Sequence, residues 1–180
     1  MAPADTAVVV TCTDAMHILL SHGYFLSDDP KEQQVMKPYP PLGLLYISAY
    51  LKSAGHMVEV FDATFQTRKA FRDMLKEQRP PVVGLYCNLM TKPTVLEMIR
   101  EARDTGAVVI VGGPEPPHYA EQFMAHGADV VVIGEGEHTL EELLPGIDRQ
   151  GVHDLGHIPG IVYRTGDGDC IRTEARPYIR

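Results

Sequence analysis

Residues 108–144 read VVIVGGPEPPHYAEQFMAHGADVVVIGEGEHTLEELL, and this stretch decides the fold class. Two short apolar runs within it, residues 108–111 and 130–133, are rich in Val and Ile, and each ends in glycine. Such runs are typical of strands that are buried on both faces of a parallel sheet. Glycine after such a strand permits a sharp turn and a close approach by a ligand. Because ligands bind at this edge of open α/β sheets, the stretch predicts two adjacent binding loops.

Strand and helix patterns alternate along the rest of the chain. The expected strands are residues 7–12, 56–62, 82–86, 107–111 and 129–133, and the expected helices are residues 41–54, 68–78, 93–105, 117–126 and 137–144, the last broken at Pro145. Each crossover is long enough for a helix, which predicts a five-stranded parallel sheet flanked by helices, Rossmann-like or flavodoxin-like. Right-handed crossovers place the loops that follow the strands on one edge of the sheet.

Residues 13–40 show no clear periodicity and carry several turn-forming residues. The pattern allows a short helical turn at residues 15–20. A connection of this length is either an exposed surface loop or a binding loop that covers a ligand, and both interpretations stay open.

The end of the chain differs from the alternating part. Residues 160–164 and 170–173 flank TGDGD, which predicts a β-hairpin with a glycine-rich turn. We therefore expect a Rossmann-like domain over residues 1–150, followed by a hairpin and linker over residues 151–180.

Composition excludes several classes of function. The formal net charge of −8 argues against nucleic acid, because phosphate binding needs a basic surface. The N-terminus lacks the features of a signal peptide, and no apolar run is long enough to span a bilayer. Cys12, Cys87 and Cys170 are too widely spaced for a disulfide framework or a CxxC metal site, and they suit a reducing cytosol. We therefore expect a cytoplasmic protein that binds neither nucleic acid nor membranes.

Among the polar residues near the carboxyl edge of the expected sheet, we expect no catalytic residue and no metal ligand. A dinucleotide site is excluded because the GxG at residues 134–136 has Thr139 where the third glycine is required. Glu137 is interpreted as a helix start, where the helix dipole favours a carboxylate, and the role of Glu135 stays open. Cys12 and Cys87 both lie at the carboxyl ends of expected strands, and buried packing is favoured over a catalytic thiol. The paired glycines before Pro114 either make room for a large flat ligand or form only a tight turn.

Four motifs follow one another along the chain. They are PPLGLLYISAYLKSAGHMVEVFDA (residues 40–63), VVGLYCNLMT (82–91), VVIVGGPEP (108–116) and GADVVVIGEGEHTLEELL (127–144). Together and in this order, they resemble the cobalamin-binding domain at the N-terminus of B12-dependent radical SAM enzymes. The tail IPGIVYRTGDGDCIRTEARPYI also resembles the strand pair and linker that lead to the radical SAM barrel.

The resemblance implies that methylcobalamin or hydroxocobalamin lies over the carboxyl edge of the sheet, base-off, for methyl transfer to a substrate. The implied cofactor-binding residues are Pro41, Leu42 and Gly43 at the edge of the corrin, Asn88, Leu89, Met90 and Thr91 at its lower face, Gly112, Gly113 and Pro114 beside the nucleotide tail, and Gly134, Glu135 and Gly136 on the other side of that groove. A large flat ring with amides at its periphery suits a backbone opened by glycine.

Two departures from related families bear on the chemistry. Asp14 and His17 are spaced DxxH, whereas B12 domains of the methionine-synthase type carry DxHxxG, so no histidine ligand to cobalt is expected. No CxxxCxxC is present, so S-adenosylmethionine and its [4Fe–4S] cluster would bind only in a downstream radical SAM domain, in cis or in trans. The linker-like tail favours a domain excised from a longer enzyme. Two alternatives stay open: a standalone cobalamin carrier or sensor, and a flavodoxin-like domain without cobalamin.

Overall fold

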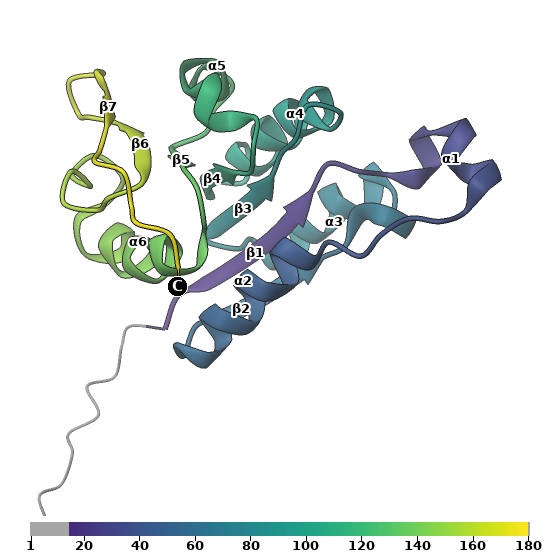
Figure 1. The fold of residues 1–180 in the computed structure, drawn as a ribbon, viewed down its shortest axis with the longest axis horizontal. Coiled ribbons are helices and arrows are strands. Elements are labelled where there is room, and N and C mark those ends of the chain that lie inside the picture. The colour runs from purple at the N-terminus through teal and green to yellow at the C-terminus, as the bar shows by residue number, and fades with distance from the viewer. Residues whose placement is uncertain (1–14, 180) are drawn as a thin grey trace, which may run out of the picture.

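The sheet at the centre of the fold has seven strands, and the first five along the chain are parallel (Figure 1). The computed structural model describes residues 15–179. Its strands are β1 (His17–His22), β2 (Met57–Phe61), β3 (Val82–Tyr86), β4 (Val108–Gly112), β5 (Val130–Val132), β6 (Ile161–Arg164) and β7 (Cys170–Arg172). They lie in the order β2-β1-β3-β4-β5-β6-β7. The parallel part therefore has the flavodoxin-like order 2-1-3-4-5, and the predicted Rossmann-like fold is confirmed.

Helices cover both faces of this sheet. They are α1 (Pro30–Val35), α2 (Leu42–Ser53), α3 (Arg68–Gln78), α4 (Lys92–Arg103), α5 (Ala120–Ala125) and α6 (Glu137–Gln150), with 3₁₀ turns η1 (Leu26–Asp28), η2 (Ala63–Phe65) and η3 (Pro116–His118). Successive strand side chains point to opposite faces. Ile18 and Ile110 accordingly belong to the core under α2 and α6, whereas Leu19 and Val109 belong to the core under α3, α4 and α5.

The first described strand, β1, lies where the sequence pattern allowed a helical turn, so that expectation was wrong. Ile18, Leu19 and Leu20 are at most 1% exposed, because β1 lies between β2 and β3 with helices on both faces. An extended backbone sends these neighbours into both cores, which a single helical turn cannot do. The strand expected at residues 7–12 lies outside the described residues.

Helix α6 continues past Pro145, where the sequence predicted a break. Proline removes one hydrogen bond from a helix interior. The turn that follows is nevertheless buried: Gly146 packs against Leu155 and Ile158, and Ile147 is 7% exposed. Burial of this apolar face outweighs the local cost, so the helix runs on to Gln150.

The predicted hairpin is present as β6 and β7, and it extends the main sheet. β6 pairs antiparallel with β5, and Val131 faces Val162 across the pair. The sheet is therefore larger than the five strands that we expected. The parallel part still ends at β5.

A segment that we call the arm, residues 24–41, projects beyond the carboxyl end of β1 and carries η1 and α1 (Figure 1). Asp29 caps the start of α1, because its carboxylate accepts hydrogen bonds from the backbone N–H groups of Lys31 and Glu32. None of the residues of α1 is buried. Within residues 15–179, no helix combines the length and the apolar character that crossing a bilayer requires.

Candidate functional site

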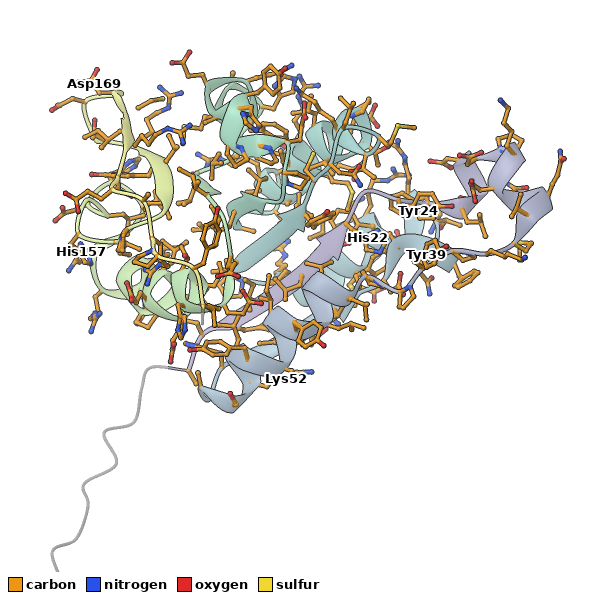
Figure 2. All side chains as sticks on the ribbon, in the orientation of Figure 1. His22, Tyr24, Tyr39, Lys52, His157 and Asp169 are labelled. Atoms are coloured by element: carbon orange, nitrogen blue, oxygen red, sulfur yellow. The ribbon has the colours of Figure 1, made fainter. Side chains whose placement is uncertain are left out.

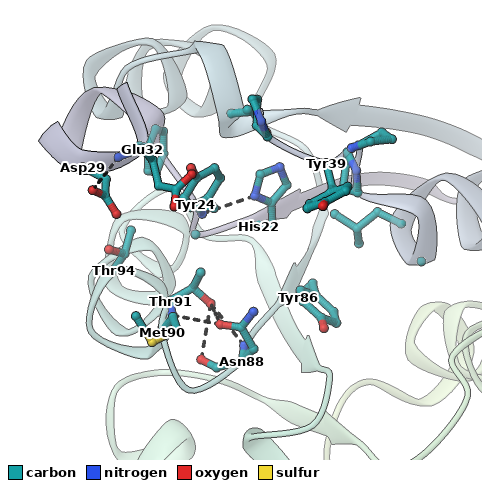
Figure 3. Close-up of a pocket in the computed structure, with 18 of the residues that line it drawn as sticks. His22, Tyr24, Asp29, Glu32, Tyr39, Tyr86, Asn88, Met90, Thr91 and Thr94 are labelled. Atoms are coloured by element: carbon teal, nitrogen blue, oxygen red, sulfur yellow. Dashed lines mark hydrogen bonds between the residues drawn. The ribbon is translucent and has the colours of Figure 1, made fainter. Parts of the chain in front are cut away.

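A cavity lies at the carboxyl ends of β1 and β3, between the arm and the body of the domain (Figure 3). These strands are neighbours in the sheet, but α2 follows β1 on one face and α4 follows β3 on the other. This is the switch point at which open α/β sheets bind ligands. The cavity volume is about 780 Å³. Its lining includes His22, Gly23, Thr64, Tyr86 and Thr94 on the body, and Tyr24, Asp28, Glu32, Lys37, Pro38 and Tyr39 on the arm; His22, Tyr24 and Tyr39 are labelled in Figure 2.

Six of the thirteen predicted cofactor-binding residues line this cavity, from two separate elements. They are Pro41, Leu42, Gly43, Asn88, Met90 and Thr91. The first three lie at the start of α2, and the others lie in the loop between β3 and α4. Whether they contact a cofactor remains a prediction.

The loop between β3 and α4 is held by hydrogen bonds between its two ends. The backbone N–H of Asn88 donates to Thr91 Oγ1 over 3.1 Å, and the backbone N–H of Thr91 donates to Asn88 Oδ1 over 3.0 Å (Figure 3). The tip between them is solvent-exposed, since Leu89 is 71% and Met90 85% exposed. A rigid turn therefore presents two large apolar side chains at the edge of the cavity.

The other seven predicted residues do not line the cavity. They are Leu89, Gly112, Gly113, Pro114, Gly134, Glu135 and Gly136. The glycine loops follow β4 and β5, along the same carboxyl edge. A Cβ at Gly112 would have ordinary contact with Val132, at 3.7 Å, whereas a Cβ at Gly113 would lie 2.4 Å from the carbonyl oxygen of Cys87. The first glycine therefore leaves room for a side chain, and the second is required by close packing.

Glu135, whose role the sequence left open, contacts the end of the described chain. Its Oε2 accepts a hydrogen bond from the backbone N–H of Ile179. Nearby, Arg176 donates two hydrogen bonds to the carboxylate of Glu142, and these bonds lower the pKa of Glu142 although burial opposes the shift. These hydrogen bonds hold the chain after β7 against Glu135, just before α6, and against Glu142 within α6.

A half-buried ion pair joins the loops that follow β3 and β4. Lys92 Nζ lies 2.9 Å from Glu115 Oε1, and both side chains are less than 20% exposed. The Lys92 ammonium also lies 3.6 Å from the centre of the Tyr119 ring, a cation–π contact. The helix dipole disfavours a positive charge in the first turn of a helix, and the carboxylate of Glu115 offsets this unfavourable interaction of Lys92. The two loops therefore form one continuous rim.

His22 is a site residue that sequence reasoning missed. Its Nδ1 accepts a hydrogen bond from the backbone N–H of Tyr24 at 3.2 Å, so the ring proton is assigned to Nε2, which donates to Asp62 Oδ1 at 3.0 Å. Burial alone would raise the pKa of Asp62, but hydrogen bonds from Thr64 and His22 outweigh it and hold that pKa below its ordinary value. Both ring nitrogens are occupied, and His22 supports the wall of the cavity.

The histidine considered for a cobalt ligand in the sequence lies at the wrong edge. His17 is the first residue of β1, at the amino edge of the sheet, whereas the cavity is at the carboxyl edge. Asp14 lies outside the described residues. Within residues 15–179, no three His, Cys, Asp or Glu side chains gather to hold a metal ion.

Cys87 is expected to resist alkylation. The residue is buried, and burial raises the pKa of its thiol to about 12, so the nucleophilic thiolate is scarce near neutrality. At about pH 8, iodoacetamide should modify the exposed Cys170 to completion while Cys87 stays unlabelled, as read by peptide mass spectrometry. Unfolding in guanidinium should make both equally reactive. Equal labelling of the two thiols in the folded protein would contradict the burial of Cys87. Cys12 lies outside the described residues.

Comparison with known proteins identifies relatives of this chain. A family model described as the B12 binding domain matches residues 34–144, more than half of the chain. Hopanoid C-3 methylase of Methylococcus capsulatus is 31% identical over 134 residues, which are 71% of this chain and 26% of that protein. Anaerobic magnesium-protoporphyrin IX monomethyl ester cyclase of Synechocystis is 30% identical over 84% of this chain and 30% of its own length. The chain therefore spans less than a third of these relatives.

Solved structures agree with the fold. The cobalamin-dependent S-adenosylmethionine radical enzyme OxsB, with aqua-cobalamin bound, superposes with a TM-score of 0.76 at 22% identity. The match covers 92% of this chain and 23% of that enzyme. At this level of identity, the likeness supports the architecture alone.

Proposed function

This chain belongs to the B12-binding domain family, and from that premise we propose that it holds cobalamin, base-off, over the carboxyl edge of β1 and β3–β5. The observation that carries the proposal is the cavity at the β1–β3 switch point, which six of the residues implied by the family resemblance line. Bound methylcobalamin supplies a transferable methyl group. The part of this chain is to bind and orient that group.

The residues around the cavity fit a large, flat and mostly apolar ligand. A cavity of about 780 Å³ is within the usual range for drug-sized ligands, so it encloses only part of a corrin with its side chains. The exposed side chains of Tyr39, Leu42 and Met90 give the cavity lining apolar surface that is open to a ligand. Past the rim, a Cβ at Gly134 would meet nothing within 4 Å. This open backbone supports a groove for the nucleotide tail beside β4 and β5.

We further propose that the bound cofactor serves a radical SAM domain, in cis or in trans, in methyl transfer. The support is that hopanoid C-3 methylase, a relative named for methyl transfer, matches this chain over only 26% of its own length. Its substrate contacts would lie in that other domain. The carboxyl-edge rim, which carries Leu89 and Met90 at its tip, is the surface that such a domain would face.

Cobalamin binding and its base-off state can be tested together. The purified chain, incubated with hydroxocobalamin and desalted, is expected to keep the visible absorption of the cofactor in about one equivalent. After reduction to Co(II), the electron paramagnetic resonance spectrum should lack nitrogen splitting, because His22 has no free ring nitrogen and the tail base is displaced. A colourless protein would contradict cobalamin binding. A triplet splitting on the cobalt lines would instead show a nitrogen ligand and contradict the base-off state.

A further inference from the structure

The arm forms one wall of the cavity although its outer half has few anchors to the body of the domain. Residues 30–37 are exposed except for Glu32, which is half-buried. The hydrogen bonds of Gln33 stay within the arm, since its Nε2 donates to the carbonyl oxygens of Leu26 and Ser27 at 3.0 and 2.9 Å. These bonds fix the internal shape of the arm. They leave its position relative to the sheet undetermined.

Arg68, the first residue of α3, connects the arm to the body. Its Nε donates to Asp28 Oδ2 in η1 at 3.1 Å, and its guanidinium lies 5.9 Å from the centre of the Phe25 ring. The same guanidinium bonds to two residues of α4, with Nη2 donating to Thr94 Oγ1 at 2.9 Å and Nη1 donating to Glu97. One planar group therefore ties η1, α3 and α4 together, which a guanidinium does through several donors in a fixed geometry.

Few other side chains could share this role. Among the described side chains outside the arm, His22 also hydrogen-bonds to it, but at Tyr24, immediately after β1. Phe25 and Leu26 anchor the same first part by burial. Asp28 of the arm and Thr94 of α4, which Arg68 joins, both line the cavity. The hydrogen bonds of Arg68 therefore fix the spacing between the arm and α4 at the cavity itself.

We propose that Arg68 is a positioning residue that holds the arm as the second wall of the cofactor cavity. The inference rests on the proposed function only in taking cobalamin as the occupant. Removing the guanidinium would free η1 and α1 to move away from α4. The cavity would then lose the wall that carries Glu32, Lys37 and Tyr39.

The chain offers a closely matched control for this role. Arg72 lies one turn further along α3, and its Nη1 donates to Glu101 of α4 at 3.1 Å. It thus makes the same kind of α3–α4 ion pair without a contact to the arm. Arg72→Ala separates the loss of an arginine between these helices from the loss of the arm's attachment.

Limited proteolysis tests the attachment without any cofactor. Lys31 is the single tryptic site of the arm, because Lys37 precedes Pro38, a bond that trypsin does not cleave. The cleavage rate reports how often the segment opens. Arg68→Ala should therefore speed cleavage after Lys31 about tenfold. Arg68→Lys should speed it less, and Arg72→Ala should leave it unchanged. Asp28→Asn should act like Arg68→Ala, and the double variant should be no faster than either. Equal cleavage of Arg68→Ala and Arg72→Ala would overturn the proposal.

Hydroxocobalamin affinity, measured by titration with the visible spectrum, tests the consequence for the cavity. Arg68→Ala should weaken binding about tenfold and Arg72→Ala should leave it unchanged, with Arg68→Lys between them. Faster cleavage with unchanged affinity would overturn the role in the cofactor site. If the unmodified chain itself binds no cobalamin, the proposed function fails, whereas the cleavage rates still decide whether Arg68 holds the arm.

Discussion

Replacing Gly112 with valine is expected to abolish the retention of hydroxocobalamin while leaving the fold intact. The backbone at Gly112 is that of an ordinary strand residue, and its Cβ would lie 3.7 Å from Val132 Cβ, so β4 should accept the side chain. The two added methyl groups would extend toward the loop that follows β5, where the nucleotide tail is proposed to lie. We expect affinity to fall about 100-fold, or about 2.7 kcal/mol, with a loss in stability below about 1.5 kcal/mol.

Cobinamide, which lacks the nucleotide tail, provides the control for this prediction. If the valine blocks only the groove for the tail, Gly112→Val should bind cobinamide as the unmodified chain does. Gly112→Ala should lie between the two proteins in its affinity for hydroxocobalamin. Far-ultraviolet circular dichroism checks the fold. Unchanged hydroxocobalamin affinity in a folded valine variant would refute the groove, and an equal loss for cobinamide would move the effect to the corrin.

Replacing the adjacent Gly113 with alanine is expected to destabilise the whole domain. Its φ of +108° is rarely adopted by residues with a side chain, and its Cβ would lie 2.4 Å from the carbonyl oxygen of Cys87. Backbone strain costs about 1–3 kcal/mol, and the overlap forces β3 and β4 apart at a similar cost. We expect the free energy of unfolding to fall by about 3 kcal/mol or more, a large part of a typical domain's stability.

Gly134→Ala separates the two causes of this effect. Gly134 also has a positive φ, of +80°, but a Cβ there would meet nothing within 4 Å. Its replacement should cost only the strain, about 1–2 kcal/mol. Denaturant unfolding followed by circular dichroism gives both values. Equal losses at the two positions would show that the close approach to Cys87 contributes nothing.

Where local signals agree with packing, the sequence predicted the fold to the residue. α3 runs over Arg68–Gln78 as expected, because Thr67 caps it by accepting from the backbone N–H of Ala70. β3 also matches its expected bounds, Val82–Tyr86. The sequence HILLSH of β1 has no strict alternation, and although Gly23 follows it directly, its identity as a strand depends on burial between β2 and β3. This burial is a property of the tertiary structure, which the local sequence pattern does not reveal.

The candidate site, like the fold, could be predicted from the sequence only in part. Glycines after buried strands located the loops at the carboxyl edge, because glycine there permits a sharp turn and a close approach. The wall formed by the arm left no such mark. It depends on the contact of Arg68 with Asp28 and of His22 with Asp62, each between residues 40 positions apart. Neither pair belongs to a recognisable motif, so the sequence predicted six residues that line the cavity but not the contacts that hold its walls together.

The order of the strands has a consequence for how the chain folds during synthesis. Every residue that lines the cavity lies between His22 and Thr94, so the ribosome delivers the complete lining before it makes β4. β3 is an inner strand of the finished sheet, however, and its second neighbour arrives only with β4. Because chains fold from the N-terminus as they emerge, the nascent first half holds the full lining of the cavity on a half-built sheet. Its exposed β3 edge is then the part most in need of protection from aggregation.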